Sequence, residues 1–275
     1  MSTSNYEIGI VDTRAVLKIL TSMGYDFRDY ALTAFKRRLE HVIALHGLKN
    51  ADGLMGKLNS QPEFIDQFIH DITPSTTEMF RDPSFWRVLR DEVLPEVFKG
   101  PSQPKIWLAA LDSGEELYSL AIILKEQNLL DKVQLYANYS SEKTLARVKA
   151  GTLDMRNIET NEANYLRLNG KSTIHSYLST TASHAFDPSL VEGVNFIFQK
   201  TTITEAPSAV RLALFRNRMI YQNHFLQEKT LQMLTNSLVA GGFLALGVKE
   251  TLENTNTSNK FTVFNDNEKL YKRKT

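Results

Sequence analysis

The stretch from Lys105 to Ser119, KIWLAALDSGEELYS, constrains the fold more than any other part of the chain. An apolar run ends in a turn of small residues that contains one glycine, Gly114, and a helical pattern begins directly after it. A strand, a tight turn and a helix in this order are typical of an α/β sheet, which binds ligands at the carboxyl ends of its strands. The stretch therefore predicts a ligand site at this turn.

Two carboxylates, Glu115 and Glu116, follow the turn, whereas phosphate-binding turns of this kind are rich in glycine. The two acids would repel a pyrophosphate and suit a ligand that is cationic or rich in hydroxyl groups. S-adenosylmethionine is such a ligand, because it carries a sulfonium, an ammonium and a ribose diol. The alternative is an ordinary buried strand and helix start, with Ser113 as the N-cap of the helix.

The composition is that of a soluble globular protein, since 42% of the 275 residues are hydrophobic and 23% are charged. The net charge of +1 argues against a nucleic-acid partner or a strongly anionic membrane. The chain has no cysteine, which excludes disulfides and is compatible with a cytoplasmic location. The six histidines are scattered, so no metal is expected. No signal peptide and no membrane-spanning run is visible, so no membrane insertion is expected.

Hydrophobic periodicity divides the chain into a helical part and a part in which strands and helices alternate. Residues 1–73 are expected to form a small all-α domain, with helices near 13–24, 30–46, 51–58 and 62–71. Residues 74–83 read as a linker punctuated by Pro74 and Pro83. Residues 84–275 are expected to form an α/β domain, with a mostly parallel sheet covered by helices on both faces.

In the α/β part, strands are expected near 105–111, 132–138, 195–199, 209–215 and 241–248, with a terminal hairpin at 260–264 and 269–272. Helices are expected at 84–98, 115–127, 141–150 and 223–238. Segment 152–194 shows no clear periodicity and has room for an insertion.

Five segments resemble, in order, motifs of the CheR family of chemotaxis methyltransferases. GYDFRDYALTAFKRRL resembles the family's helical N-terminal region, and TEMFRDPSFWRVLRDEVLP resembles its T-x-F-F-R-[DE] signature. WLAALDSGEELYSLA is similar to W-x-A-x-C/A-S-T-G-E-E-P-Y-S-x-A, LFRNRMIYQ to F-C-R-N-V-x-I-Y-F, and LVAGGFLALGVKE to L-x-P-G-G-x-L-x-x-G-x-S-E. The resemblance covers nearly the whole chain. It implies a Rossmann-like S-adenosylmethionine methyltransferase domain preceded by a small all-α domain.

The resemblance also implies an activity, which is O-methylation of glutamate side chains on chemoreceptor-like or other signalling proteins. S-adenosylmethionine would donate the methyl group and leave as S-adenosylhomocysteine. The acceptor glutamate is already ionised at neutral pH, so the site needs an orienting cation rather than a strong base. Arg81 is the expected cation, because a guanidinium matches a carboxylate bidentately. Tyr221 matches the family's active-site tyrosine, whose ring can face the sulfonium.

Arg81 could instead be an ordinary surface or capping arginine, and Tyr221 a buried tyrosine at a strand end. Glu116 matches the glutamate that contacts the methionine portion of the cofactor. Arg216 either joins the cofactor wall or pairs with a nearby carboxylate. The full set of expected cofactor-binding residues is Thr77, Arg81, Ala110, Gly114, Glu116, Asn138, Thr202 and Asn217.

Several departures from the family pattern bear on activity. Asn138 stands where the family has an aspartate that accepts hydrogen bonds from the ribose diol, and the lost charge is expected to weaken cofactor binding by about 1–2 kcal/mol. Thr202 replaces Asn or Asp near the adenine, Asp112 adds an acid to the turn, and Lys249 replaces a serine. They motivate an alternative function, a non-catalytic relative that binds the cofactor or a protein and has a regulatory role.

The acceptor protein is less constrained by the sequence. Lys36, Arg37 and Arg38 either meet an acidic partner helix or form an ordinary solvated face. Some family members carry a small β-subdomain that grips a receptor tail, and none is expected here because 152–194 shows no paired strands. A small-molecule methyltransferase is a third alternative, which the expected helical N-terminal domain disfavours.

Overall fold

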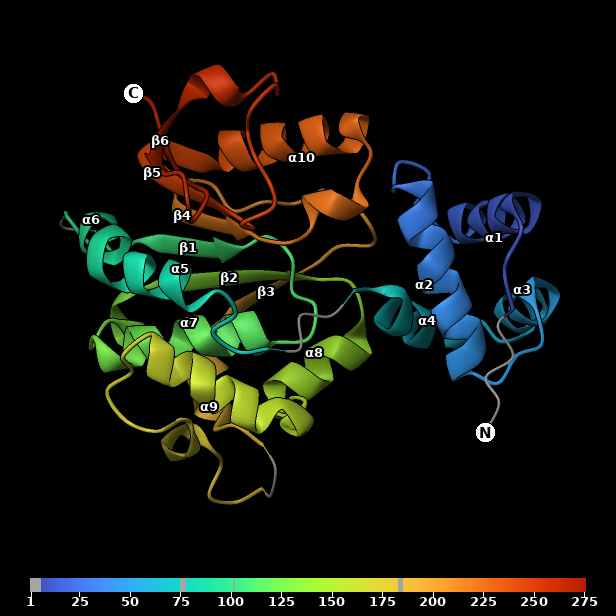
Figure 1. Ribbon diagram of the computed structural model, residues 1–275, viewed down its shortest axis with the longest axis horizontal. Helices are drawn as coiled ribbons and strands as arrows, with labels where there is room; N and C mark the ends of the chain where they lie inside the picture. Colours follow the sequence, from blue (N-terminus) through green and yellow to red (C-terminus); the bar gives the residue numbers. More distant parts are fainter. Residues whose placement is uncertain (1–5, 75–77, 101, 183–184) are drawn as a thin grey trace.

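The computed structural model describes residues 6–74, 78–100, 102–182 and 185–275 and consists of two domains (Figure 1). The helical domain packs four helices around one apolar core: α1 (Ile10–Ser22), α2 (Leu32–Leu45), α3 (Ala51–Ser60) and α4 (Phe64–Ile72). The all-α domain expected from the periodicity is confirmed. No helix in the described ranges has the length and apolar character needed to cross a membrane.

The larger domain is built on a seven-stranded sheet with the order β3-β2-β1-β4-β5-β7-β6. Its strands are β1 (Lys105–Leu108), β2 (Gln134–Tyr139), β3 (Asn195–Phe198), β4 (Val210–Phe215), β5 (Leu238–Leu246), β6 (Phe261–Asn265) and β7 (Leu270–Arg273). Strands β1 to β5 pair in parallel, and β7 runs antiparallel to β5 and β6. The strand order reverses at β1, so the space between β1 and β4 is the topological switch point.

Helices cover both faces of the sheet (Figure 1). One face carries α5 (Pro83–Val88), a π-helical turn (Leu89–Val93), α6 (Leu94–Val97), α7 (Glu115–Glu126), α8 (Glu142–Lys149) and α9 (Ile158–Arg167), and α10 (His224–Ser237) covers the other. Alternate residues of β1 feed the two cores, because Ile106 and Leu108 point to one face and Trp107 to the other. The expected mostly parallel sheet is therefore confirmed.

Segment 152–194 contains the helix α9 and short 3₁₀ turns, and its described residues form no strand. The sequence pattern misses α9 because two of its buried positions are polar. The Asn161 side-chain oxygen accepts a hydrogen bond from the Met79 N–H at 2.9 Å, and the Asn164 amide donates to the Met79 carbonyl at 3.1 Å. These asparagines hold the linker, so they do not contribute to an apolar stripe.

Two sets of backbone contacts fix the helical domain against the carboxyl edge of the sheet. The Ala31 N–H donates to the Tyr221 carbonyl at 2.8 Å, between the start of α2 and the loop after β4. Asp66 of α4 caps α8 by accepting from the N–H groups of Glu142 at 2.7 Å and Lys143 at 3.0 Å. The helical domain thus forms a wall beside the strand ends.

Candidate functional site

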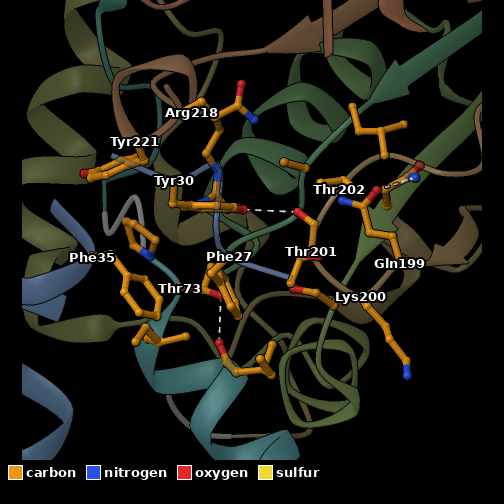
Figure 2. Close-up of a pocket in the computed structure, with 18 of the residues that line it drawn as sticks. Phe27, Tyr30, Phe35, Thr73, Gln199, Lys200, Thr201, Thr202, Arg218 and Tyr221 are labelled. Atoms are coloured by element: carbon orange, nitrogen blue, oxygen red, sulfur yellow. Dashed lines mark hydrogen bonds between the residues drawn. The ribbon is translucent and has the colours of Figure 1, made fainter. Parts of the chain in front are cut away.

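An open pocket lies between the helical domain and the carboxyl ends of the strands, with an empty space of about 840 Å³ that includes the part continuous with solvent (Figure 2). The α/β domain lines it with Ala110 after β1, Asn138 in β2, residues after β3, and Tyr221 after β4. The helical domain lines it with aromatic and charged side chains, among them Phe27, Tyr30, Phe35 and Arg38. This is the switch point at which open α/β sheets bind their ligands.

The predicted site residues fall into three groups. Four line the pocket: Ala110, Asn138, Thr202 and Tyr221. Two line a smaller adjoining pocket of about 240 Å³ that shares Ala110 and Leu111 with the first: Gly114 and Glu116. The structure places two others, Arg81 and Asn217, in the wall of neither pocket, and Thr77 lies outside the described residues.

Gly114 is required by the turn before α7. Its φ of +107° is one that side-chain-bearing residues rarely adopt. A Cβ atom there would lie 2.8 Å from Val148 Cγ2 and 3.0 Å from Leu153 Cδ2. The groups that approach this glycine closely are therefore these two side chains of the protein itself.

Glu116 belongs to an ion-pair network centred on Arg216, whose side chain is 2% exposed, whereas those of Glu116 and Asp82 are 22% and 24% exposed. Arg216 donates to Glu116 Oε1 at 3.0 Å and to Asp82 Oδ2 at 2.8 Å, and its guanidinium lies 3.8 Å from the Phe85 ring centre. Arg216 was expected either to join the cofactor wall or to pair with a nearby carboxylate, and the structure shows the pairing. Burial raises the pKa of Glu116, and the charge of Arg216 opposes that rise.

Arg81 sits in a backbone segment that is held on several sides. Phe80 and Asp82, which flank it, both have positive φ, at 51° and 60°. The Phe80 N–H donates to Ser119 Oγ, and the Arg81 carbonyl accepts from Trp86 Nε1, each at 2.9 Å. The Arg81 side chain itself is exposed and has no ion-pair partner within the described ranges. Its guanidinium is therefore free to meet a ligand.

Asn138 is fully buried, and its side-chain amide is engaged by the protein. The oxygen accepts from Trp107 Nε1 at 2.7 Å, and the NH₂ group donates to Gln199 Oε1 at 3.0 Å and to the Glu205 carbonyl at 2.9 Å. An asparagine suits this position because a carboxylate would face the Glu205 carbonyl without a proton to donate. The contacts give a structural reason for the departure from aspartate.

We expect the Asn138→Asp variant to lose about 2–3 kcal/mol of unfolding free energy, because a buried carboxylate replaces a donor that has two acceptors. Urea unfolding measures this loss, with the exposed Asn236→Asp as the matched control. Affinity for S-adenosylhomocysteine should not rise. A stable variant with about tenfold tighter binding would instead mean that the side chain turns toward the ligand.

Glu250 organises the loop after β4, and the sequence reasoning missed it. Its carboxylate is 4% exposed. It accepts backbone hydrogen bonds from Gly247 at 2.7 Å, Asn217 at 2.9 Å, Met219 at 2.6 Å and Ile220 at 3.4 Å. Asn217, at a φ of 59°, thus belongs to a loop whose shape Glu250 sets. The available signal is its place as the last residue of the GVKE motif.

The contribution of the helical domain to the pocket was also missed. Tyr30 donates its hydroxyl to the Thr201 carbonyl at 3.1 Å, across the two domains (Figure 2). Arg38 lines the pocket and caps α4, donating to the carbonyls of Ile72 at 2.9 Å and Thr73 at 3.1 Å. Burial lowers the pKa of Arg38.

The three basic residues of α2 do not form one docking face for an acidic partner. Arg38 is directed to the end of α4, as its hydrogen bonds show. Lys36 pairs with Glu7 at 2.8 Å within the helical domain. Arg37 is exposed.

Comparison with known proteins gives consistent results for the two domains. The all-alpha domain of CheR methyltransferases matches residues 16–73, and the SAM-binding domain of CheR methyltransferases matches residues 75–269. The chain is 32% identical to Cher3 of Pseudomonas putida, a candidate methyltransferase, over 88% of this chain and 89% of that protein. It is 28% identical to chemotaxis protein methyltransferase 1 of Pseudomonas aeruginosa, over 79% and 81%. It is 24% identical to the chemotaxis protein methyltransferase of Listeria innocua, over 84% and 86%.

Proposed function

Because the chain belongs to the CheR methyltransferase family, whose SAM-binding domain spans most of it, we propose that it methylates glutamate side chains of chemoreceptor-like signalling proteins in the cytoplasm. Relatives over most of its length are named chemotaxis protein methyltransferases, which supports this acceptor class. The observation that carries the proposal is the pocket at the switch point, which the helical domain and the strand ends share. No comparison favours the non-catalytic alternative.

The pocket fits S-adenosylmethionine. Aromatic rings of Tyr30, Phe215 and Tyr221 line it, and such rings attract a sulfonium cation. Gln222 Oε1 is a buried acceptor in its wall with no hydrogen-bond partner in the described ranges, which suits a ligand with N–H or O–H donors.

In this proposal the two adjoining pockets bind different parts of the cofactor. Glu116 would meet the ammonium of the methionine portion, Thr202 would lie by the adenine, and Tyr221 would face the sulfonium. Ala110 leaves room at the end of β1. The side-chain amide of Asn138 already donates to Gln199 and to the Glu205 carbonyl. Asn138 would therefore act through its backbone and through its hydrogen bond to Gln199.

When bound, the cofactor supplies an activated methyl group for an in-line displacement. The protein has to orient the acceptor carboxylate and keep water out of the pocket. Arg81 would hold the carboxylate bidentately, because its guanidinium is exposed and its backbone is fixed. No proton needs to be removed from a glutamate that is ionised at neutral pH. Alignment of this kind can lower the activation free energy of methyl transfer by about 7–11 kcal/mol.

The proposal is tested by incubating the protein with S-adenosylmethionine and the cytoplasmic fragment of a chemoreceptor. Mass spectrometry of peptides from the fragment should find methyl esters on glutamate side chains, and mild base should remove them. An unmodified fragment, or methyl groups on another residue type, would contradict the proposed function.

Replacing Arg81 by alanine should lower the rate of methyl transfer by about 100-fold, because the acceptor carboxylate loses its orienting cation. Affinity for S-adenosylhomocysteine should change much less. Arg87→Ala, at an exposed position of α5, is the matched control. Equal rates for the two variants would remove Arg81 from the proposed mechanism.

A further inference from the structure

Two charged side chains bridge the ends of β1 and β4 beside the pocket. Asp112, in the turn after β1, forms an ion pair with Arg218, in the loop after β4. Their side chains are only 11% and 14% exposed. Arg218 lines the large pocket and Asp112 the adjoining one. The pair therefore stands where the two pockets meet, at the switch point of the sheet.

Both members of the pair depart from the motifs that the chain resembles. Asp112 occupies the serine position of C/A-S-T-G-E-E, and Arg218 occupies the valine position of R-N-V. The two positions lie 106 residues apart in the sequence and touch in the fold. Two opposite charges thus meet at one place in the pocket wall where the resembled motifs have two neutral residues, and a joint role follows from their contact.

The guanidinium of Arg218 has more donors than Asp112 uses. An arginine carries five N–H donors in a planar fork, and its two edges can each hold a carboxylate. Arg218 Nε is buried and has no hydrogen-bond partner in the described ranges. Figure 2 shows the side chain directed toward Tyr30 at the pocket wall. Burial lowers the pKa of Arg218 to about 10, so it stays cationic at neutral pH.

We propose that Arg218, positioned by Asp112, binds a carboxylate inside the pocket. The carboxylate comes either from the glutamate that is methylated or from the methionine portion of the cofactor. The role rests on the proposed function, because both sources belong to that reaction. Arg81 belongs to the linker and lines neither pocket, whereas Arg218 lines the large pocket between the ends of β1 and β4, so the two cations are separate.

The test uses the double variant Asp112→Ser/Arg218→Val, which restores the neutral residues of the motifs and leaves no unpaired buried charge. Arg167→Val, at an exposed position of α9, is the control. Calorimetry gives the affinity for S-adenosylhomocysteine and for methylthioadenosine, which lacks the amino-acid portion. Transfer of labelled methyl gives KM and kcat for a receptor fragment. Arg218→Lys, which keeps the charge without the fork, serves if the double variant does not fold.

If the carboxylate is that of the cofactor, the double variant should bind S-adenosylhomocysteine at least about tenfold more weakly and methylthioadenosine as tightly as the wild type does. If it is that of the acceptor, cofactor affinity should hold while KM for the fragment rises about tenfold. Unchanged affinity for S-adenosylhomocysteine would overturn the assignment if KM and kcat for the fragment are also unchanged, or if the wild type itself transfers no methyl group. Weaker binding in a protein that methylates no fragment would refute the proposed function and keep the role of Arg218.

Discussion

The Glu250→Ala variant is expected to lose about 3–5 kcal/mol of unfolding free energy and nearly all methyl transfer, because four backbone N–H groups lose their acceptor at once. Three of these groups belong to the loop that leads to Tyr221, and the fourth to Gly247. The loop would no longer hold the pocket wall in one conformation. Urea unfolding and calorimetry with S-adenosylhomocysteine measure the two effects.

Two further variants sharpen this prediction. Glu250→Gln keeps one acceptor oxygen but turns an NH₂ group toward N–H donors, so its stability should lie between those of wild type and Glu250→Ala. Glu253→Ala removes an exposed carboxylate from the same segment and should leave stability and binding unchanged. A loss below about 1 kcal/mol in Glu250→Ala would mean that water replaces the carboxylate and that the loop needs no internal acceptor.

Arg216→Met should be destabilised by about 3 kcal/mol, because Asp82 and Glu116 are left without their shared cation. The methionine keeps part of the packing on Phe85, so the loss reflects the charge. Arg156→Met is the matched control, since it breaks an ion pair with Asp154 whose arginine is 89% exposed. Its loss should stay below about 1 kcal/mol. Equal losses in the two variants would show that the network around the buried Arg216 is no stronger than a surface pair.

The loss of unfolding free energy caused by Arg216→Met, its stability deficit, should depend on pH. Burial raises the pKa of Glu116, and removing Arg216 removes the charge that opposes the rise. A carboxyl group with a raised pKa binds its proton more tightly in the folded protein, so its unfavourable contribution shrinks as the pH falls. The deficit should be smaller at about pH 5 than at about pH 8. A deficit independent of pH would show that Glu116 stays ionised in the variant.

The fold could be predicted well from local pattern. The helices and strands expected from apolar periodicity are present, because most of them bury one face or stripe; β3, which has no fully buried residue, is an exception. The exceptions have local causes. β5 begins at Leu238 rather than 241, since Gly241 and Gly242 lie inside the strand, where the register with β4 shifts. The helix α9 escaped the pattern because Asn161 and Asn164 bind backbone atoms of the linker.

The site was less predictable, because side-chain partners depend on contacts between distant segments. Ala110, Asn138, Thr202 and Tyr221 were expected at the strand ends and do line one pocket. The inward amide of Asn138 depends on Gln199 and Glu205, 61 and 67 residues away. No local pattern could bring Tyr30 to Thr201 either, because that contact joins two domains.

The measurement that tests the pocket assignment most directly is a calorimetric titration with S-adenosylhomocysteine. It compares the wild type with Ala110→Phe, which fills the wall shared by both pockets, and with Ala150→Phe, an exposed position at the end of α8. We expect a Kd of about 1–10 μM for the wild type and for Ala150→Phe, and at least about tenfold weaker binding for Ala110→Phe. Equal affinity in all three proteins, or no binding at millimolar ligand, would contradict the account.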